Sequence, residues 1–393
     1  PKTVATQQML VDDESDLVYH IVCSRNRPGG EPEKGLKPLE CSWYTKHETN
    51  PRTAKLPEQH DRIFRRSSEF SYDAMRFSSQ IEAEKYSLLG DGDNPAPGLK
   101  NIDYVFGLAD WLAMHYQKRV LLILRTSHVL AFLMGFMFIL YSDYDVGQLF
   151  LYAFLVFFFA AAGLHMLAKN RGWHRKYLDY RTLAEGLRVQ FYWAAAGVAN
   201  ENISKFTHDN FLQTQDPELG WIRNVMRVAG TRCDAMPEKT RGGLAFTLQE
   251  WLEGQLSYYA RKSEWRVSRQ RFTERLGQLS LAVSAVVVFV FLIMGASLPD
   301  RFSDPLVIIM GTTLLLFGVR HGYSYSTAEK ELIRQYDYML RVFANAKLRI
   351  EHAADDDEKR QVLQALGGSA LNEHAQWILM HRERSVDQGD VWL

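Results

Sequence analysis

Four apolar segments limit what this chain can fold into more than any other feature of its sequence. Two of them contain 22 uncharged residues, which as helices would be about 33 Å long, and the hydrocarbon core of a bilayer is about 30 Å thick. The first segment reaches the same length only if it begins at Val120 and includes Arg125, and the last must continue past Arg320 and His321. A buried core helix is the alternative for any single segment, but four of them, paired across short loops, indicate a membrane protein. Their charge-free parts are residues 127–141, 147–168, 277–298 and 305–319.

We therefore predict an all-α membrane protein whose four transmembrane helices form two hairpins, residues 120–168 and 276–321, extended by long cytoplasmic helices. The loop within the first hairpin, residues 142–146, contains no Lys or Arg, and in the loop of the second hairpin, residues 299–304, Arg301 is the one basic residue. The other ends of the four spans are rich in Lys and Arg. By the positive-inside rule, both loops face outward, and both termini and the segment between the hairpins lie in the cytoplasm.

The rest of the chain divides around these hairpins. An N-terminal cytoplasmic linker is expected to be mostly irregular, with one short strand near 16–23 and one helix at about 59–88. The two hairpins belong to two similar helical repeats that enter the membrane from the same side. The predicted regions are the linker 1–98, the first repeat 99–205, a cytoplasmic connector 206–243, the second repeat 244–355, and a C-terminal helix and tail 356–393.

Helical periodicity identifies the apolar faces of two long cytoplasmic helices. On the helix that precedes the first span, the face contains Ile102, Val105, Phe106, Ala109, Leu112, Ala113 and Tyr116. On the helix that follows the second span, it contains Tyr177, Tyr180, Leu183, Leu187 and Phe191. Arg181 and Glu185, four residues apart, are interpreted as a surface ion pair.

Composition and motifs give no indication of an enzyme. The 46 basic and 46 acidic residues balance, which offers no argument for nucleic acid as a partner. Three scattered cysteines, Cys23, Cys41 and Cys233, are typical of neither a disulfide framework nor a metal cluster. His374 and His381 are interpreted as exposed helix residues, and the acidic run at 355–357 as a solvated linker. No catalytic, cofactor or metal site is therefore predicted.

The spans contain no acidic or basic residue in their cores, which argues against a proton- or ion-coupled carrier. The polar residues that remain are the candidates for the lining of a pore: Gln278, Ser280, Ser284, Thr312 and Thr313. Packing within a four-helix bundle is the alternative for these residues, and for the small residues at 160–163, 282–285, Gly311 and Gly318. Candidates for a cytoplasmic gate or a lipid-headgroup site are Arg125, Arg320 and His321.

Three stretches carry a resemblance to a known family. The segment YLDYRTLAEGLRVQFYW follows the second span, and DRIFRRSSEFSYDAM and IDYVFGLADWLAMHYQKR precede the first. Together with the basic-flanked hairpins, they resemble the SLATT-type transmembrane effector modules of bacteria, which are associated with nucleotide-sensing SLOG domains. The resemblance covers about residues 59–350. It implies a bacterial inner membrane location and a role in antiviral defence.

The chain differs from that family in lacking a recognisable SLOG domain, because residues 1–60 are too short for a doubly wound nucleotide-binding fold. The sensor is therefore expected on an upstream part or on a separate chain. The functional hypothesis is a homo-oligomeric membrane effector or ligand-gated channel, embedded in the lipid bilayer and responding to a nucleotide-derived signal. The alternative is a non-conducting scaffold that recruits a cytoplasmic partner.

Overall fold

The computed structural model describes residues 6–12, 17–23, 40–45, 52–53, 58–89, 97–143, 148–198, 219–230, 243–294 and 298–390. The chain forms two compact units, and three of its helices contribute to both. The first unit contains residues 1–113, 178–238 and 371–393. The second contains residues 114–177 and 239–370.

The first unit begins with a small antiparallel sheet of strand order β1-β2-β3-β4. β2 (Leu17–Cys23) is the strand predicted near 16–23, and it pairs with β1 (Thr6–Asp12) and β3 (Glu40–Thr45). β4 (Arg52–Thr53) adds two residues at the edge. The expectation of a mostly irregular linker was wrong for β1, β3 and β4, because the hydrogen bonds that form a strand come from a partner that local sequence does not reveal.

Helices α1 (Glu58–Arg76) and α2 (Ser78–Glu84) follow. The helical character predicted for 59–88 is confirmed, but the stretch is two helices divided at Phe77, and the second ends at Glu84. α5 (Trp173–Ala196) provides the centre of the first unit, since from Leu178 onward most of its side chains are buried on all sides. Phe70 of α1, Tyr180 of α5 and Trp221 of α7 (Gly220–Gly230) form an aromatic cluster with ring centroids 5.5–6.2 Å apart. α7 is a helix within the predicted connector that the sequence analysis did not identify.

The long helix α3 (Pro97–Asp143) confirms the predicted continuation from the cytoplasmic segment into the first span. In its N-terminal half, six of the seven predicted apolar positions are buried, and only Val105 is partly exposed. The apolar positions at Tyr180, Leu183, Leu187 and Phe191 of α5 are buried as well. Tyr177, the remaining predicted position on α5, is partly exposed. Helical periodicity therefore located the core face of α3, whereas on α5 the predicted face is only part of a surface that is buried on all sides.

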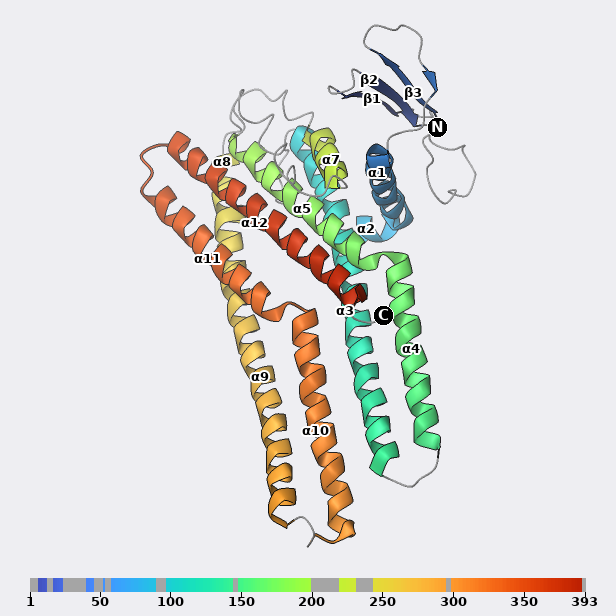
Figure 1. The fold of residues 1–393 in the computed structure, drawn as a ribbon. Helices are drawn as coiled ribbons and strands as arrows, with labels where there is room; N and C mark the ends of the chain where they lie inside the picture. Colours follow the sequence, from blue (N-terminus) through green and yellow to red (C-terminus); the bar gives the residue numbers. More distant parts are fainter. Residues whose placement is uncertain are drawn as a thin grey trace. The chain divides into compact units, whose positions relative to one another are not determined.

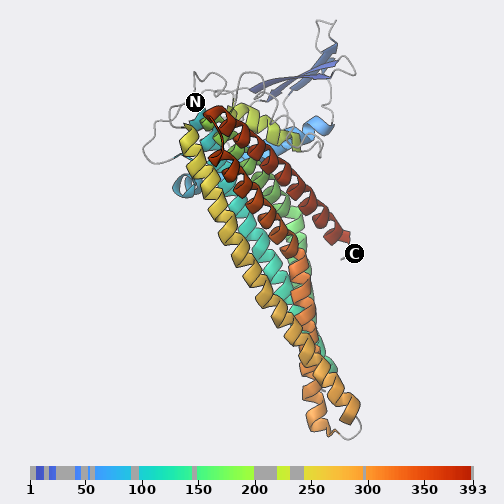
Figure 2. The ribbon, with the colours of Figure 1, turned by 90° about the vertical axis from the view of Figure 1, so that its left-hand side faces the viewer.

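The second unit contains the candidate spans. Four helical stretches are long and apolar enough to cross a membrane: 98–142, 149–171, 243–294 and 301–326. The first stretch belongs to α3, the second is α4 (Leu149–Arg171), and the fourth belongs to α10 (Asp300–Ser326). The third is a continuous helical segment of α8 (Gly243–Thr247), η2 (Leu248–Glu253, a π-helical turn) and α9 (Gly254–Met294). α9 and α10 lie side by side and antiparallel (Figures 1 and 2). The structure thus has the two predicted helical hairpins and is the fold of a helical membrane protein.

The second predicted loop is largely helical. The carbonyl of Pro299 accepts the N–H groups of Phe302 and Ser303 at 2.8 and 3.2 Å, so that α10 begins at Asp300 and includes most of residues 299–304. The connection between the third and fourth spans is correspondingly shorter at its C-terminal side. The acidic bend after the first span lies partly outside the described residues.

Both halves of the chain use the same joint after the second helix of the hairpin. α4 ends at Gly172, with φ of 59°, before α5 begins at Trp173. α10 ends near Ala328, with φ of 50°, before α11 (Glu329–Glu351) begins. These two left-handed residues support the predicted repeat, because α3–α4–α5 and α9–α10–α11 then share element order and joint. The last helix, α12 (Asp356–Asp390), confirms the predicted C-terminal helix.

Candidate functional site

The best-packed face within the candidate spans is the contact between α9 and α10. Gly277, Ser280, Ser284 and Val287 recur at steps of three and four residues and are buried. A Cβ atom placed on Gly277 would lie 3.6 Å from both Phe317 and Arg320 of α10. The small side chains of α9 therefore allow the two helix backbones to approach closely.

Ser284 and Thr313 form a hydroxyl pair across this contact. Their Oγ and Oγ1 atoms are 2.6 Å apart, and Ser284 Oγ also lies 3.3 Å from the carbonyl oxygen of Met310 on α10. Within each helix the hydroxyls approach backbone carbonyls as well: Ser284 that of Ser280 at 3.1 Å, and Thr313 that of Ile309 at 2.8 Å. Each hydroxyl has one hydrogen, so these contacts share two donors, and both oxygens are satisfied inside the chain.

The other predicted pore-lining residues lie differently. Ser280 is buried on the same face and donates to the carbonyl of Leu276 at 2.9 Å. Gln278 is exposed. The Thr312 hydroxyl oxygen is buried and has no hydrogen-bond partner among the described residues. The structure thus brings Ser280, Ser284 and Thr313 together and leaves Gln278 and Thr312 apart from them, and a pore lining remains a prediction for all five.

The three predicted gate or headgroup residues also differ. Arg320 donates from Nη2 to Thr273 Oγ1 at 2.7 Å and lies 3.9 Å from Glu329, whose carboxylate also accepts the Ser324 hydroxyl at 3.0 Å. It therefore belongs to a polar junction of α9, α10 and α11. His321 is exposed, with its ring stacked on Phe317, and Arg125 is exposed.

α3 packs on α10 through glycines. A Cβ atom on Gly135 would lie 2.7 Å from a methyl of Leu315, and one on Gly311 would lie 3.1 Å from a methyl of Ile139. The packing predicted for Gly311 is confirmed. Gly318 and Gly163, in contrast, face open space.

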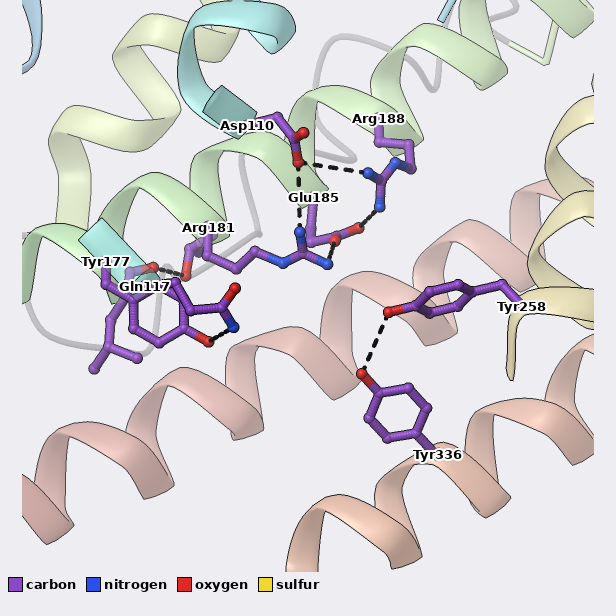
Figure 3. Close-up of polar contacts among 10 residues, drawn as sticks. Asp110, Gln117, Tyr177, Arg181, Glu185, Arg188, Tyr258 and Tyr336 are labelled. Atoms are coloured by element: carbon purple, nitrogen blue, oxygen red, sulfur yellow. Dashed lines mark hydrogen bonds and ion pairs between the residues drawn. The ribbon is translucent and has the colours of Figure 1, made fainter. Parts of the chain in front are cut away.

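The first unit contains a polar cluster that the sequence analysis described only in part (Figure 3). Arg181 Nη2 and Arg188 Nη1 contact the two oxygens of Glu185 at 2.5 and 2.6 Å. Both arginines also approach Asp110 of α3, at 3.4 and 3.8 Å. The predicted pair of Arg181 and Glu185 is confirmed, but it is a half-buried part of a four-residue cluster that fastens α5 to α3, and not a surface pair. The same figure includes, in the second unit, the hydroxyl contact of Tyr258 with Tyr336 at 3.4 Å and that of Gln117 with Tyr177 at 3.1 Å.

His374 of α12 adjoins this cluster, contrary to the expectation of an exposed histidine. It is buried, its ring stacks on Trp377 at 4.9 Å, and its Nε2 atom has no hydrogen-bond partner among the described residues. Burial is the main reason that the pKa of His374 is lowered from 6.5 to about 4; the Glu185 carboxylate opposes this decrease, and the charges of Arg181 and Arg188 add to it. Burial alone would raise the pKa of Glu185, but Arg181 and Arg188 lower it from 4.5 to about 2. At neutral pH the cluster therefore contains ionised Glu185 and uncharged His374.

Two fully buried carboxylates complete the polar contacts of α5. Asp179 accepts a hydrogen bond from Arg382 Nη2 of α12 at 2.6 Å. Asp73 of α1 accepts the Tyr180 hydroxyl at 2.7 Å. Arg382 thus attaches α12 to α5.

The acidic run before α12 has a capping role. Asp355 Oδ1 accepts the N–H of Glu358 at 2.7 Å, which makes Asp355 the N-cap of α12. The Glu358 carboxylate accepts the N–H of Ala354, the residue before the N-cap, at 2.7 Å. Asp356 and Asp357 pair with Lys359 and Arg360. Within the described part of the chain, no group of three or more potential metal ligands occurs.

Fold and contacts together define a helical membrane protein with four candidate spans. Comparison with protein-family models, curated proteins and solved structures finds no match.

Proposed function

We propose that the chain is an oligomeric membrane effector or ligand-gated channel of a bacterial antiviral-type signalling system. A nucleotide-derived signal, sensed by a SLOG domain upstream or on a separate chain, would change the packing of the four candidate spans in the inner membrane, with both termini in the cytoplasm. The resemblance to SLATT-type modules supports the signalling context. The exposure of the spans supports the oligomer.

That exposure is the single observation that carries the proposal. In the most apolar 18-residue stretches of α3, α4 and α10, no residue is buried within the chain, and in that of α9 only 22% are. One chain therefore covers little of its own span surface, which leaves room for lipid and for other copies. Symmetric association of such helices around an axis is the usual way to build a pore from short spans.

Gln278 and the hydroxyl pair would act differently in such a pore. Gln278 is exposed next to Leu279 and Leu281, and its amide gains more from a water-filled lumen than from lipid. Ser284 and Thr313 bond to each other, so their hydroxyls would line a lumen only after α9 and α10 separate. The same bond favours the alternative, a non-conducting scaffold whose hairpins are anchors, because it satisfies the hydroxyls of Ser284 and Thr313 without water.

Planar-bilayer recording of the purified protein, with candidate nucleotides added to either side, tests the proposal. In a background without native cysteines, Q278C is expected to react with a charged thiol reagent and to alter the current. L279C, on an exposed apolar position at the same depth but about 100° further round the helix, is the matched control and should react much more slowly. Silence under every nucleotide tested, with equal reaction of the two cysteines, would favour the scaffold.

A further inference from the structure

The surface of α9 immediately before its apolar part is cationic and uncovered. We define this surface, the α9 collar, as Arg269, Arg271, Phe272 and Arg275, all of which are exposed. At 1.5 Å per residue, Phe272 and Arg275 lie within about 6 Å of Leu276, where the apolar span begins, and Arg269 lies about 10 Å from it. The polar layer on each side of a bilayer is about 5–8 Å thick, so the collar coincides with the layer of lipid headgroups.

The cations of the collar are not neutralised by the part of the chain that the structure describes. Arg269, Arg271 and Arg275 make no ion pair with any residue that the structure describes. The one carboxylate between Arg269 and Leu276 is Glu274, which accepts a hydrogen bond from Gln270 at 2.8 Å and lies 3.9 Å from Lys330. Three positive charges therefore remain available to an external anion.

An aromatic residue accompanies these charges on the same surface. The Phe272 side chain is 70% exposed, although it is large and apolar. On the helix, Arg271, Phe272 and Arg275 fall within about 100° of one another. Arg269 is held over the ring of Trp265, with its guanidinium carbon 5.3 Å from the ring centroid. A ring between guanidinium groups is suited to a boundary where apolar chains and anionic groups meet.

The equivalent part of α3 also carries exposed cations, Lys118 and Arg125, but part of its positive charge contacts aromatic rings within the chain. Arg119 of α3 lies over the rings of Tyr116 and Trp173, at 5.9 and 5.1 Å, and Lys176 of α5 lies over Tyr116 at 5.2 Å. These cations contribute to packing inside the chain. On α9 the corresponding charges point away from the chain's own helices.

We propose that the α9 collar is a binding surface for anionic phospholipid headgroups. The occupant is inferred from charge complementarity and from continuity, because the exposed side chains of Leu276 and Leu279 extend the same surface into the span. Arginine guanidinium groups would donate to the phosphate and Phe272 would contact the adjoining acyl chain. The inference depends on α9 spanning the membrane and not on whether the protein conducts.

Lipid titration of the delipidated full-length protein, read by native mass spectrometry, tests it. Phosphatidylglycerol is expected to bind more tightly than phosphatidylcholine of the same acyl chains. Each of R271Q and R275Q should reduce that preference about fivefold, and the double variant more, since each cation near an anionic surface contributes by about that factor. R271K and R275K should retain most of it. R349Q, an exposed arginine on α11 without an ion pair in the described chain, is the matched control and should change nothing.

Several results would overturn the proposal. Equal binding of the two lipids by the natural sequence would do so. A loss of lipid preference in R349Q as large as that in R271Q or R275Q would also do so, because it would show that only the overall charge matters. Displacement of phosphatidylglycerol by inorganic phosphate at constant ionic strength would indicate a site for free anions. A change of oligomeric state in R271Q/R275Q at unchanged lipid preference would assign the surface to contacts between copies.

Discussion

The hydroxyl oxygens of Ser284 and Thr313 lie 2.6 Å apart across the contact of α9 and α10. Hydrogen bonds between membrane helices contribute about 0.6 kcal/mol on average, because the separated helices also find partners. T313V is therefore expected to lower the free energy of unfolding in detergent by about 0.5–1.5 kcal/mol. A cycle with S284A should give a positive coupling energy, and additive effects would show that the contact is not formed.

Thr312 provides the matched control for this experiment. Its hydroxyl is buried without a partner in the described chain, whereas that of its neighbour Thr313 is bonded. Removing an unsatisfied polar group while keeping the shape is neutral or stabilising. T312V is expected to leave the midpoint of SDS-induced unfolding unchanged or to raise it. A loss as large as that of T313V would contradict the assignment.

The buried pair of Asp179 and Arg382 predicts a strong dependence of the C-terminal helix on one arginine. In R382M, the fully buried Asp179 carboxylate would lose the charged hydrogen bond from Arg382, which costs about 3–5 kcal/mol. Limited proteolysis should then cleave within α12 at protease concentrations that leave the natural sequence intact. The exposed pair of Arg341 and Asp337 supplies the comparison, since R341M should cost under about 0.5 kcal/mol.

His374 predicts a loss of stability in mild acid. Its pKa is 6.5 when unfolded and about 4 when folded, so the unfolded chain binds the proton more tightly. The contribution of His374 to the free energy of unfolding is complete above pH 6.5 and is lost as the pH falls toward 4, with a total on the order of 3 kcal/mol. Glu185, lowered from 4.5 to about 2, adds a loss only below pH 4.5. The melting temperature of H374F should therefore fall less than that of the natural sequence between pH 6.5 and 4.5, and parallel curves would refute the prediction.

The two left-handed residues, Gly172 and Ala328, are expected to respond differently to exchange of glycine and alanine. At Gly172 a Cβ atom would meet only the Arg175 side chain at 3.7 Å, so G172A should cost only the conformational penalty of about 1–2 kcal/mol. At Ala328 that penalty is already present. A328G removes this penalty, but it also removes a buried methyl worth about 0.8 kcal/mol and increases the conformational entropy of the unfolded chain. The net change in the free energy of unfolding should therefore be close to zero. Thermal unfolding of the two variants compares the joints directly.

Local patterns were sufficient for the parts of the fold that depend on one helix at a time. The four apolar segments, the continuous α3 and the buried face at Ile102, Phe106 and Leu112 all follow from hydrophobicity at helical spacing. The strand at Leu17–Cys23 was recognised from its own residues. Its partners β1 and β3 were not, because pairing and not composition makes them strands.

Relationships between distant segments were beyond the sequence. Arg188 and Asp110 are 78 positions apart, and nothing local indicates that α5 and α3 bring them together. Ser284 was selected as a polar residue in a span, but its pairing with Thr313 depends on the register of two helices. For His374, in contrast, the sequence did contain a pattern that indicates burial. Leu371, Ala375 and Ile378 are buried around it at helical spacing, which placed it on the apolar face of α12.

α4 has no buried residue along its whole length, although it is among the most apolar helices of the chain. No described part of the chain therefore packs against α4 closely enough to select particular side-chain shapes. We expect Leu, Ile, Val and Phe to be interchangeable over most of α4, while a single Asp or Lys at its centre would be rejected. The face of α9 at Gly277 and Ser284 should show the reverse: large side chains are excluded there, and small polar ones are tolerated. Saturation mutagenesis would therefore distinguish α4, where the lipid limits the allowed residues, from α9, where packing against α10 limits them.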